Sequence, residues 1–259
     1  MTEWSLFDLL SPVLSRIDNV MRDGLGLAPV WRIAVFAALG SMVSMWLFKK
    51  LSNQDELARL KLQIRTVQKE LVGERGGLKN ALQRNLKLTV RQLCLSFWPA
   101  LLASVPILFL LAFSSNQFGV AAIPAGARTY VTPIGLERSP ADYRWQGVNA
   151  QWDARKSAWT FYQPEAGQVA SLMLGEQLQL SLPTVAAAST IHRRHWWNIL
   201  LANPAGYLDA NASIGRFDIN APPQIIFDWG PGWMRGWLFA FMVFLVLFSV
   251  AVKVVWKIE

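Results

Sequence analysis

The sequence predicts an integral membrane α-helical protein with three transmembrane helices. A cytoplasmic antiparallel helical hairpin joins the first two, and an exoplasmic all-β, sandwich-like domain precedes the third. Of the 259 residues, 53% are hydrophobic and only 16% are charged, whereas soluble proteins carry about 25% charged residues. Three stretches are long and apolar enough to cross a bilayer, and strand-like segments gather between the last two. Together these observations predict the fold class.

The same composition argues against several functional classes. The single Cys94 excludes a disulfide framework and a Cys-rich metal site. Only His192 and His195 are available for His-based catalysis, and no nearby Cys or carboxylate completes a metal set around them. Nucleotide-binding, metalloprotease and serine-hydrolase motifs are absent from the sequence. We therefore predict a protein that is not an enzyme and has no catalytic residues, cofactor or metal.

Residues 1–29 are predicted to form an amphipathic helix on the outer side. Its apolar residues recur at helical spacing: Leu6, Leu10, Val13, Ile17, Val20 and Met21. Two interpretations remain open, since such a helix either lies on the membrane surface or packs against the outer domain.

The candidate spans are residues 30–48, 93–113 and 236–256. A hydrocarbon core of about 30 Å requires roughly 20 apolar residues in a helix, which each segment supplies. The third is the most apolar, and Trp237 and Trp256 near its ends suit the aromatic belts of a bilayer. Lys253 lies close to its end, where a long side chain reaches the headgroups.

Charge predicts the orientation of these spans. Residues 49–92 carry 11 Lys and Arg against 4 Asp and Glu, a net of +7, and the positive-inside rule keeps this segment in the cytoplasm. The amino end and residues 114–235 then lie outside, and residues 257–259 form a cytoplasmic tail. The membrane is predicted to be the bacterial inner membrane, or the endoplasmic reticulum membrane in a eukaryote. Because most of the whole-chain charge of +8 belongs to this one segment, no nucleic-acid partner is expected.

Residues 49–92 are predicted to form a coiled-coil hairpin. Apolar residues spaced by three and four precede a glycine-rich turn at 73–77, and leucines at four-residue spacing follow it. The residues of this predicted docking hairpin are Leu57, Leu60, Ile64, Val67, Leu71, Leu78, Leu82 and Leu86. The basic outer face is either a solvated or lipid-contacting surface, or a docking site for a cytoplasmic partner or a nascent hydrophobic segment.

The order of these segments resembles a known family. The match covers WRIAVFAALGSMVSMWLFKKLSNQDELARLKLQIRTVQKELVGERGGLKNALQRNLKLTVRQLCLSFWPALLASVPILFLL and the final span. An outside amino end, one span, a basic cytoplasmic hairpin and two further spans resemble the YidC/Oxa superfamily of membrane insertases. The likeness is greatest to the three-span branch of archaea and the endoplasmic reticulum, which includes subunit three of the ER membrane protein complex. The outer domain is longer than the connection expected in that branch.

This resemblance implies a groove, open to cytoplasm and lipid, that shelters polar parts of an entering segment. It also implies a basic residue in the groove, for which Arg32, beside the outer end of the first span, is the candidate. Candidate groove-lining hydroxyls are Ser41, Ser44, Ser96 and Ser104. For these serines, close helix packing is the alternative role.

Residues 114–235 are predicted to form the β domain. Six segments are strand-like: 127–134, 141–148, 157–163, 176–182, 212–220 and 223–229. A charged turn between aromatic ends predicts a hairpin at 151–159, and HWWNILL at 195–201 predicts a short helix.

Three functional hypotheses follow. The first is an insertase-like or chaperone-like biogenesis factor for membrane proteins. The second is a structural or scaffold subunit of an inner-membrane complex, whose periplasmic β domain joins partner subunits. The third is ligand sensing by the outer domain. The expected partners are membrane lipid and other membrane proteins or subunits of a complex.

Overall fold

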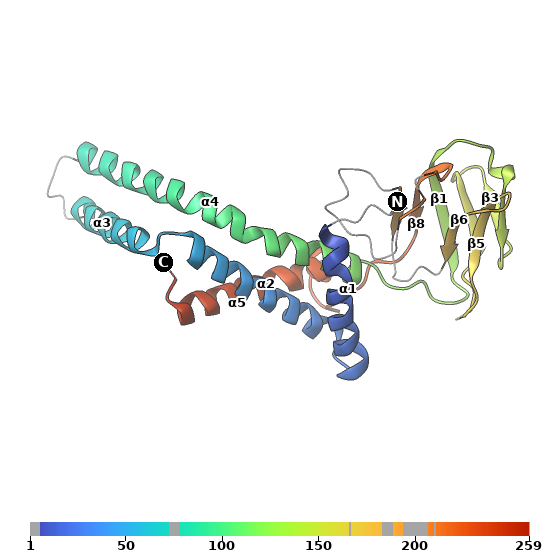
Figure 1. Ribbon diagram of the computed structural model, residues 1–259, viewed down its shortest axis with the longest axis horizontal. Coiled ribbons are helices and arrows are strands. Elements are labelled where there is room, and N and C mark those ends of the chain that lie inside the picture. Colours follow the sequence, from blue (N-terminus) through green and yellow to red (C-terminus); the bar gives the residue numbers. More distant parts are fainter. Residues whose placement is uncertain are drawn as a thin grey trace. The chain divides into compact units, whose positions relative to one another are not determined.

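The computed structural model describes residues 6–72, 78–165, 167–182, 189–193, 207–209 and 211–258. Its α-helices are α1 (Leu6–Asn19), α2 (Pro29–Leu51), α3 (Gln54–Val72), α4 (Leu78–Phe118) and α5 (Trp237–Trp256) (Figure 1). By length and composition, α2, α4 and α5 are each able to cross a membrane. This confirms the prediction of three apolar helices. The chain divides into two compact units, residues 1–33 with 111–240 and residues 34–110 with 241–259, and each is described by itself.

The longest helix, α4, joins two segments that were predicted separately. It runs for 41 residues from the hairpin through the predicted second span, with Pro99 and Pro106 inside it. A proline lacks the amide that bonds the preceding turn. Long apolar helices tolerate this where neighbouring helices and Ser or Thr side chains satisfy the freed groups. The predicted boundary between residues 92 and 93 is therefore a point within one helix.

Helix α1 continues into a single π-helical turn, η1 (Val20–Gly24). Leu10, Val13 and Val20, three of the predicted apolar residues, are exposed, whereas Met21 is buried. Asp18 lies on the inward side of the helix and is completely buried. The exposed side of α1 thus carries Leu10 and Val13 together with Arg16 and Asn19, and its inward side carries a carboxylate.

The described part of the β region contains two antiparallel sheets. The five-stranded sheet has the order β3-β4-β1-β8-β7, and the three-stranded sheet has the order β2-β5-β6. The strands are β1 (Arg128–Leu136), β2 (Tyr143–Gln146), β3 (Gln151–Asp153), β4 (Ala158–Tyr162), β5 (Ala170–Leu174), β6 (Gln177–Leu182), β7 (Thr190–His192) and β8 (Ile214–Ile219) (Figure 1).

Both sheets contribute to one hydrophobic core. Val131 and Phe217 enter it from the five-stranded sheet, and Leu172 and Leu180 enter it from the three-stranded sheet. Because alternate residues of a strand point to opposite faces, each sheet turns one apolar face inward. Removing these faces from water provides the main driving force for folding the region.

A buried polar cluster crosses this core. The hydroxyl of Tyr143 on β2 lies 2.7 Å from Ser213 Oγ, just before β8. Gln179 Oε1 on β6 accepts bonds from the backbone nitrogen and hydroxyl of Ser213, each at 3.1 Å. A buried polar group is costly without a partner, so this cluster favours one alignment of the two sheets.

Five of the six predicted strand segments contain strands, and the sixth does not. The hairpin at 151–159 is confirmed, because Asp153 pairs with Ala158 across the β3–β4 turn. The prediction for 223–229 is wrong beyond one isolated bridge at Pro223. There the amides of Ile226 and Phe227 both donate to the carbonyl of Arg235, which closes a loop. Strands β5 and β7 were not predicted, and the predicted helix at 195–201 lies outside the described residues.

Asp218 makes the stability of the β region depend on pH. Its carboxylate accepts two bonds from Arg216, at 2.6 and 2.8 Å, and one from Thr190, at 3.1 Å. The bond from Arg216 above all holds the pKa of Asp218 below its ordinary value, against the effect of burial, and Thr190 adds to the lowering. A lowered pKa adds stability above the unfolded-state value of about 3.9, and this contribution is lost as pH falls through the folded-state value.

We therefore expect Asp218→Asn to lower the free energy of unfolding of the full chain at neutral pH. The decrease should be about 1 kcal/mol or less, because the pair is partly exposed. Thermal unfolding between about pH 3 and pH 7 measures this decrease. The free energies of unfolding of Asp218→Asn and of the unmodified chain should converge at the acid end of this range. Asp142→Asn, at an exposed site, serves as the control. A constant difference between Asp218→Asn and the unmodified chain across this range would contradict the assignment.

Candidate functional site

Small residues bring α2 close to its neighbours in the helical unit. A Cβ added at Gly40 would lie 3.1 Å from Leu110 Cδ1, which is tighter than ordinary contact. Ser41 is completely buried, and its Oγ lies 2.8 Å from the carbonyl oxygen of Ala37 and 3.0 Å from that of Leu245. Small side chains permit such close packing of apolar helices. Ser41 therefore joins α2 to α5.

Further along these helices, toward Leu51 and Trp256, the packing leaves a cavity of about 310 Å³. Its walls are mostly hydrocarbon, and its polar side chains are two serines and one lysine. The lining residues are Ser44, Met45 and Phe48 of α2, Ala100, Ala103, Ser104 and Ile107 of α4, Lys253 of α5, and Ile258.

Ser44 differs from the other candidate serines in its hydrogen bonding. Its side chain is buried, with 5% of the residue exposed, and within the described part of the chain its Oγ has no hydrogen-bond partner. Ser96 and Ser104 instead donate to carbonyls of their own helix, at 2.9 and 2.7 Å. A buried hydroxyl without a partner costs about 1–3 kcal/mol. The cavity therefore contains a polar group whose bonding is not satisfied within the described residues.

Lys253 and Ile258 line the cavity near the end of α5. Lys257 adopts a left-handed conformation, with φ of 51°, and the amide of Ile258 then donates to the carbonyl of Lys253 at 3.1 Å. This turn folds the chain back and buries Ile258. Lys49 Nζ donates to the carbonyl of Trp256 at 2.8 Å, so a cation also caps the end of α5.

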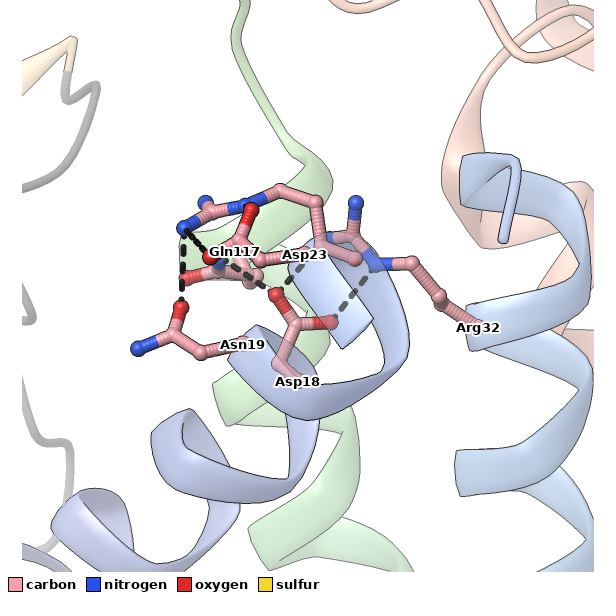
Figure 2. A network of polar contacts seen from close by, with 6 residues as sticks. Asp18, Asn19, Asp23, Arg32 and Gln117 are labelled. Carbon is pink, nitrogen blue, oxygen red and sulfur yellow. Dashed lines mark hydrogen bonds and ion pairs between the residues drawn. The ribbon is translucent and has the colours of Figure 1, made fainter. Parts of the chain in front are cut away.

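Arg32 does not line this cavity. It belongs to the other unit, where its guanidinium donates to both carboxylate oxygens of Asp18, at 2.8 and 2.6 Å (Figure 2). Gln117 of α4 donates to the same carboxylate at 2.8 Å, and the ring of Phe118 lies 4.9 Å from the guanidinium carbon. Both charged residues are buried. Arg32 therefore joins α1 to the first turns of α2 and the last turn of α4.

Of the predicted groove residues, the structure brings Ser44 and Ser104 together and adds Lys253. Arg32, Ser41 and Ser96 are not among the lining residues. The sequence contained one signal for Lys253, since it is the only charged residue within the most apolar helix. Asp18 was not singled out, because nothing in the local pattern shows that Arg32 lies opposite it.

The hairpin residues separate into two groups. Leu57, Leu60, Ile64 and Val67 form the buried face of α3, whereas Leu82 and Leu86 are 60% and 65% exposed. The side chains of Leu71 and Leu78 lie outside those described. Helices α3 and α4 lie side by side (Figure 1), and Arg91 of α4 pairs with Glu56 of α3 at 2.8 Å.

The half-buried face of this part of α4 is not the predicted leucine stripe. It contains Ala81, Asn85, Leu88, Gln92 and Leu95, whose spacing alternates between four and three residues. Such spacing is typical of the seam of a helical pair. Leu82 and Leu86 point away from that face, and with Val90 and Leu93 they leave an apolar stripe exposed.

No group of three or more His, Cys, Asp or Glu able to hold a metal ion occurs among the described residues. Comparisons of the chain with protein-family models, with curated proteins and with solved structures give no match. The resemblance to the YidC/Oxa superfamily therefore stays a prediction from the order and character of the segments.

Proposed function

We propose that this chain is an insertase-like or chaperone-like biogenesis factor for membrane proteins, and that the cavity between α2, α4 and α5 receives part of its client. The observation that carries the proposal is the buried hydroxyl of Ser44, which has no hydrogen-bond partner among the described residues, in a cavity whose walls are mostly hydrocarbon. A lipid chain has no polar atom to offer at that point. A polypeptide segment offers backbone and side-chain groups.

The proposed topology follows from charge. Helices α2, α4 and α5 span the membrane, the basic α3–α4 hairpin lies in the cytoplasm, and the amino end and β region lie on the opposite side. Ser44 is seven residues before the last residue of α2, which corresponds to about 10 Å of helix. The cavity then lies in the cytoplasmic half of the bilayer. The proposed membrane is the bacterial inner membrane, or that of the endoplasmic reticulum in a eukaryote.

Such a cavity lowers the cost of bringing polar groups into lipid. A charged residue at the centre of a translocating segment costs about 2.5–3.5 kcal/mol on insertion scales. Hydroxyls inside membranes contribute about 0.6 kcal/mol per interhelical bond on average, so Ser44 and Ser104 offset a small part of this cost. Lys253 offsets more where the segment carries an acidic group, because opposite charges attract strongly away from water.

The exposed stripe of the hairpin supports the same proposal. In the proposed topology, Leu82 and Leu86 lie on the cytoplasmic part of α4. Both are exposed, and Leu93, the first residue of the predicted span, continues the stripe. An apolar segment arriving from the cytoplasm thus meets an apolar surface before it reaches the membrane. Docking on this stripe and transfer to the cavity are the two proposed steps.

Site-specific photocrosslinking tests the proposal. A photoreactive residue is placed at Ser44 or Ser104 in the full chain, and at Val246, an exposed position of α5 that does not line the cavity. During synthesis of a membrane protein with a polar group in its span, adducts with the nascent chain are expected at the two cavity positions. Val246 should give lipid adducts. Only lipid adducts at Ser44 and Ser104, or equal nascent-chain adducts at Val246, would contradict the proposal.

A second function, as a structural subunit of a membrane complex, is favoured by the exposure of Leu82 and Leu86. When another subunit covers exposed leucines on a cytoplasmic hairpin, apolar surface is removed from water and the complex is stabilised. Purification in mild detergent distinguishes this function. A stable stoichiometric partner is expected if the stripe is an assembly surface, and an isolated monomer with no bound partner would exclude this role.

A further inference from the structure

The loop between the β region and α5, residues 225–236, presents large apolar side chains to its surroundings. Ile225, Trp229 and Trp233 are 60%, 60% and 72% exposed. The only charged residues of the loop are Asp228 and Arg235. We refer to residues 225–236 as the aromatic loop.

The aromatic loop is folded by its own hydrogen bonds. Arg235 accepts bonds from the amides of Ile226 and Phe227, at 2.8 and 3.3 Å, and its side-chain Nε donates to the carbonyl of Gly230 at 2.8 Å. Gly230 has a φ of 85°, a conformation that favours glycine. The exposed Trp229 and Trp233 thus belong to a turn that is held by its own hydrogen bonds.

The same loop packs against the first turn of α5. The ring of Phe239 lies 5.5 Å from that of Trp233 and 6.2 Å from that of Phe227, centroid to centroid. The ring of Trp229 in turn lies 5.5 Å from that of Phe227. Phe239 is the third residue of a helix whose mean hydropathy is 2.7 over its most apolar window. The aromatic loop is therefore continuous with the end of an apolar helix.

We propose that the aromatic loop binds the phospholipid surface, with Trp229 and Trp233 in the headgroup region. Tryptophan favours this region because its ring is apolar and its N–H still finds a polar partner. Contact with Phe239 places the loop at the level where α5 enters the bilayer. The inference rests on the proposed span of α5 and is independent of the cavity. It makes the loop a membrane anchor for the chain that leaves β8.

Environment-sensitive fluorescence in lipid vesicles tests this anchor. Cys94 is first replaced by Ser in the full chain, and a single cysteine is introduced by Trp233→Cys or Gly232→Cys and labelled with a fluorophore. At Gly232 an added Cβ meets no atom within 4 Å, so this variant retains the loop if loss of Trp233 disturbs it. Arg155→Cys, in the exposed β3–β4 turn, is the control.

In vesicles of phosphatidylcholine and phosphatidylglycerol, labels at both loop positions should show blue-shifted emission and quenching by lipids spin-labelled near the headgroup. The label at Arg155 should show neither effect. Emission and quenching equal to the Arg155 control at both loop positions would overturn the inference. Shielding from a water-soluble quencher without quenching by the lipids would indicate a protein occupant and would also overturn it. If the crosslinks from Ser44 and Ser104 to the nascent chain fail while the lipids quench the loop labels, only the proposed function is rejected.

Discussion

Replacement of Asp18 by alanine is expected to lower the free energy of unfolding of the chain in detergent by about 3–5 kcal/mol, because it leaves the Arg32 guanidinium buried without its partner. Arg32 donates hydrogen bonds to both oxygens of this carboxylate, and Gln117 donates a further hydrogen bond to one of them (Figure 2). Equilibrium unfolding followed by circular dichroism gives the change. Hydrogen exchange should also rise first in α1, which the Asp18 carboxylate joins to the rest of its unit.

The neighbouring pair of Arg22 and Asp23 supplies a matched control. Its shortest contact is 2.9 Å, but both side chains are about half exposed or more. An exposed ion pair contributes little, so Asp23→Ala should leave the unfolding curve unchanged within error. The double variant Asp18→Leu with Arg32→Met should recover much of the lost stability, because no charge is then left buried. Equal effects of Asp18→Ala and Asp23→Ala would contradict the assigned role of the buried pair.

On the proposed function, replacement of Lys253 by glutamate is expected to reduce insertion of a client with one aspartate in its span at least tenfold. A tenfold change corresponds to about 1.4 kcal/mol, and two unit charges 4 Å apart near a protein surface interact by about 4 kcal/mol. The measurement is the fraction of newly made client that becomes resistant to alkaline extraction from membranes containing each variant.

The control for this prediction changes the client. With the aspartate replaced by lysine, the order should reverse, because Lys253→Glu then supplies the opposite charge. Lys253→Gln should give intermediate insertion of both clients. If Lys253→Glu reduces insertion of both clients equally, the lysine contributes to folding and does not select for charge.

The regular elements were predictable because they depend on neighbouring residues. Three apolar segments reach the length of a span, and alternating apolar residues predicted five strand segments. The failed segment at 223–229 has the composition of a strand, yet two of its amides bond within a loop, and Ile225 and Trp229 are exposed. Composition alone does not separate a residue that fills a core from one that is exposed.

In the hairpin, too, the sequence pattern alone did not identify the buried face of a helix. Two stripes run along the first part of α4, one rich in leucine and one interrupted by Asn85 and Gln92. Periodicity favoured the first, but the second is half-buried and Leu82 and Leu86 are exposed. Which side of a helix packs inward depends on the shape and charge of its neighbour, as the Glu56–Arg91 pair illustrates.

The sequence by itself predicted three apolar segments long enough to cross a membrane, a basic segment between the first two, and most of the strands. These properties follow from hydrophobicity, charge and spacing, which are local. Only the tertiary structure decided that Arg32 and Gln117 both donate hydrogen bonds to Asp18, and that Ser44 Oγ, unlike Ser41 Oγ, has no hydrogen-bond partner among the described residues. Such bonds join residues far apart along the chain, and a hydrogen bond requires donor and acceptor to lie within about 3 Å of each other.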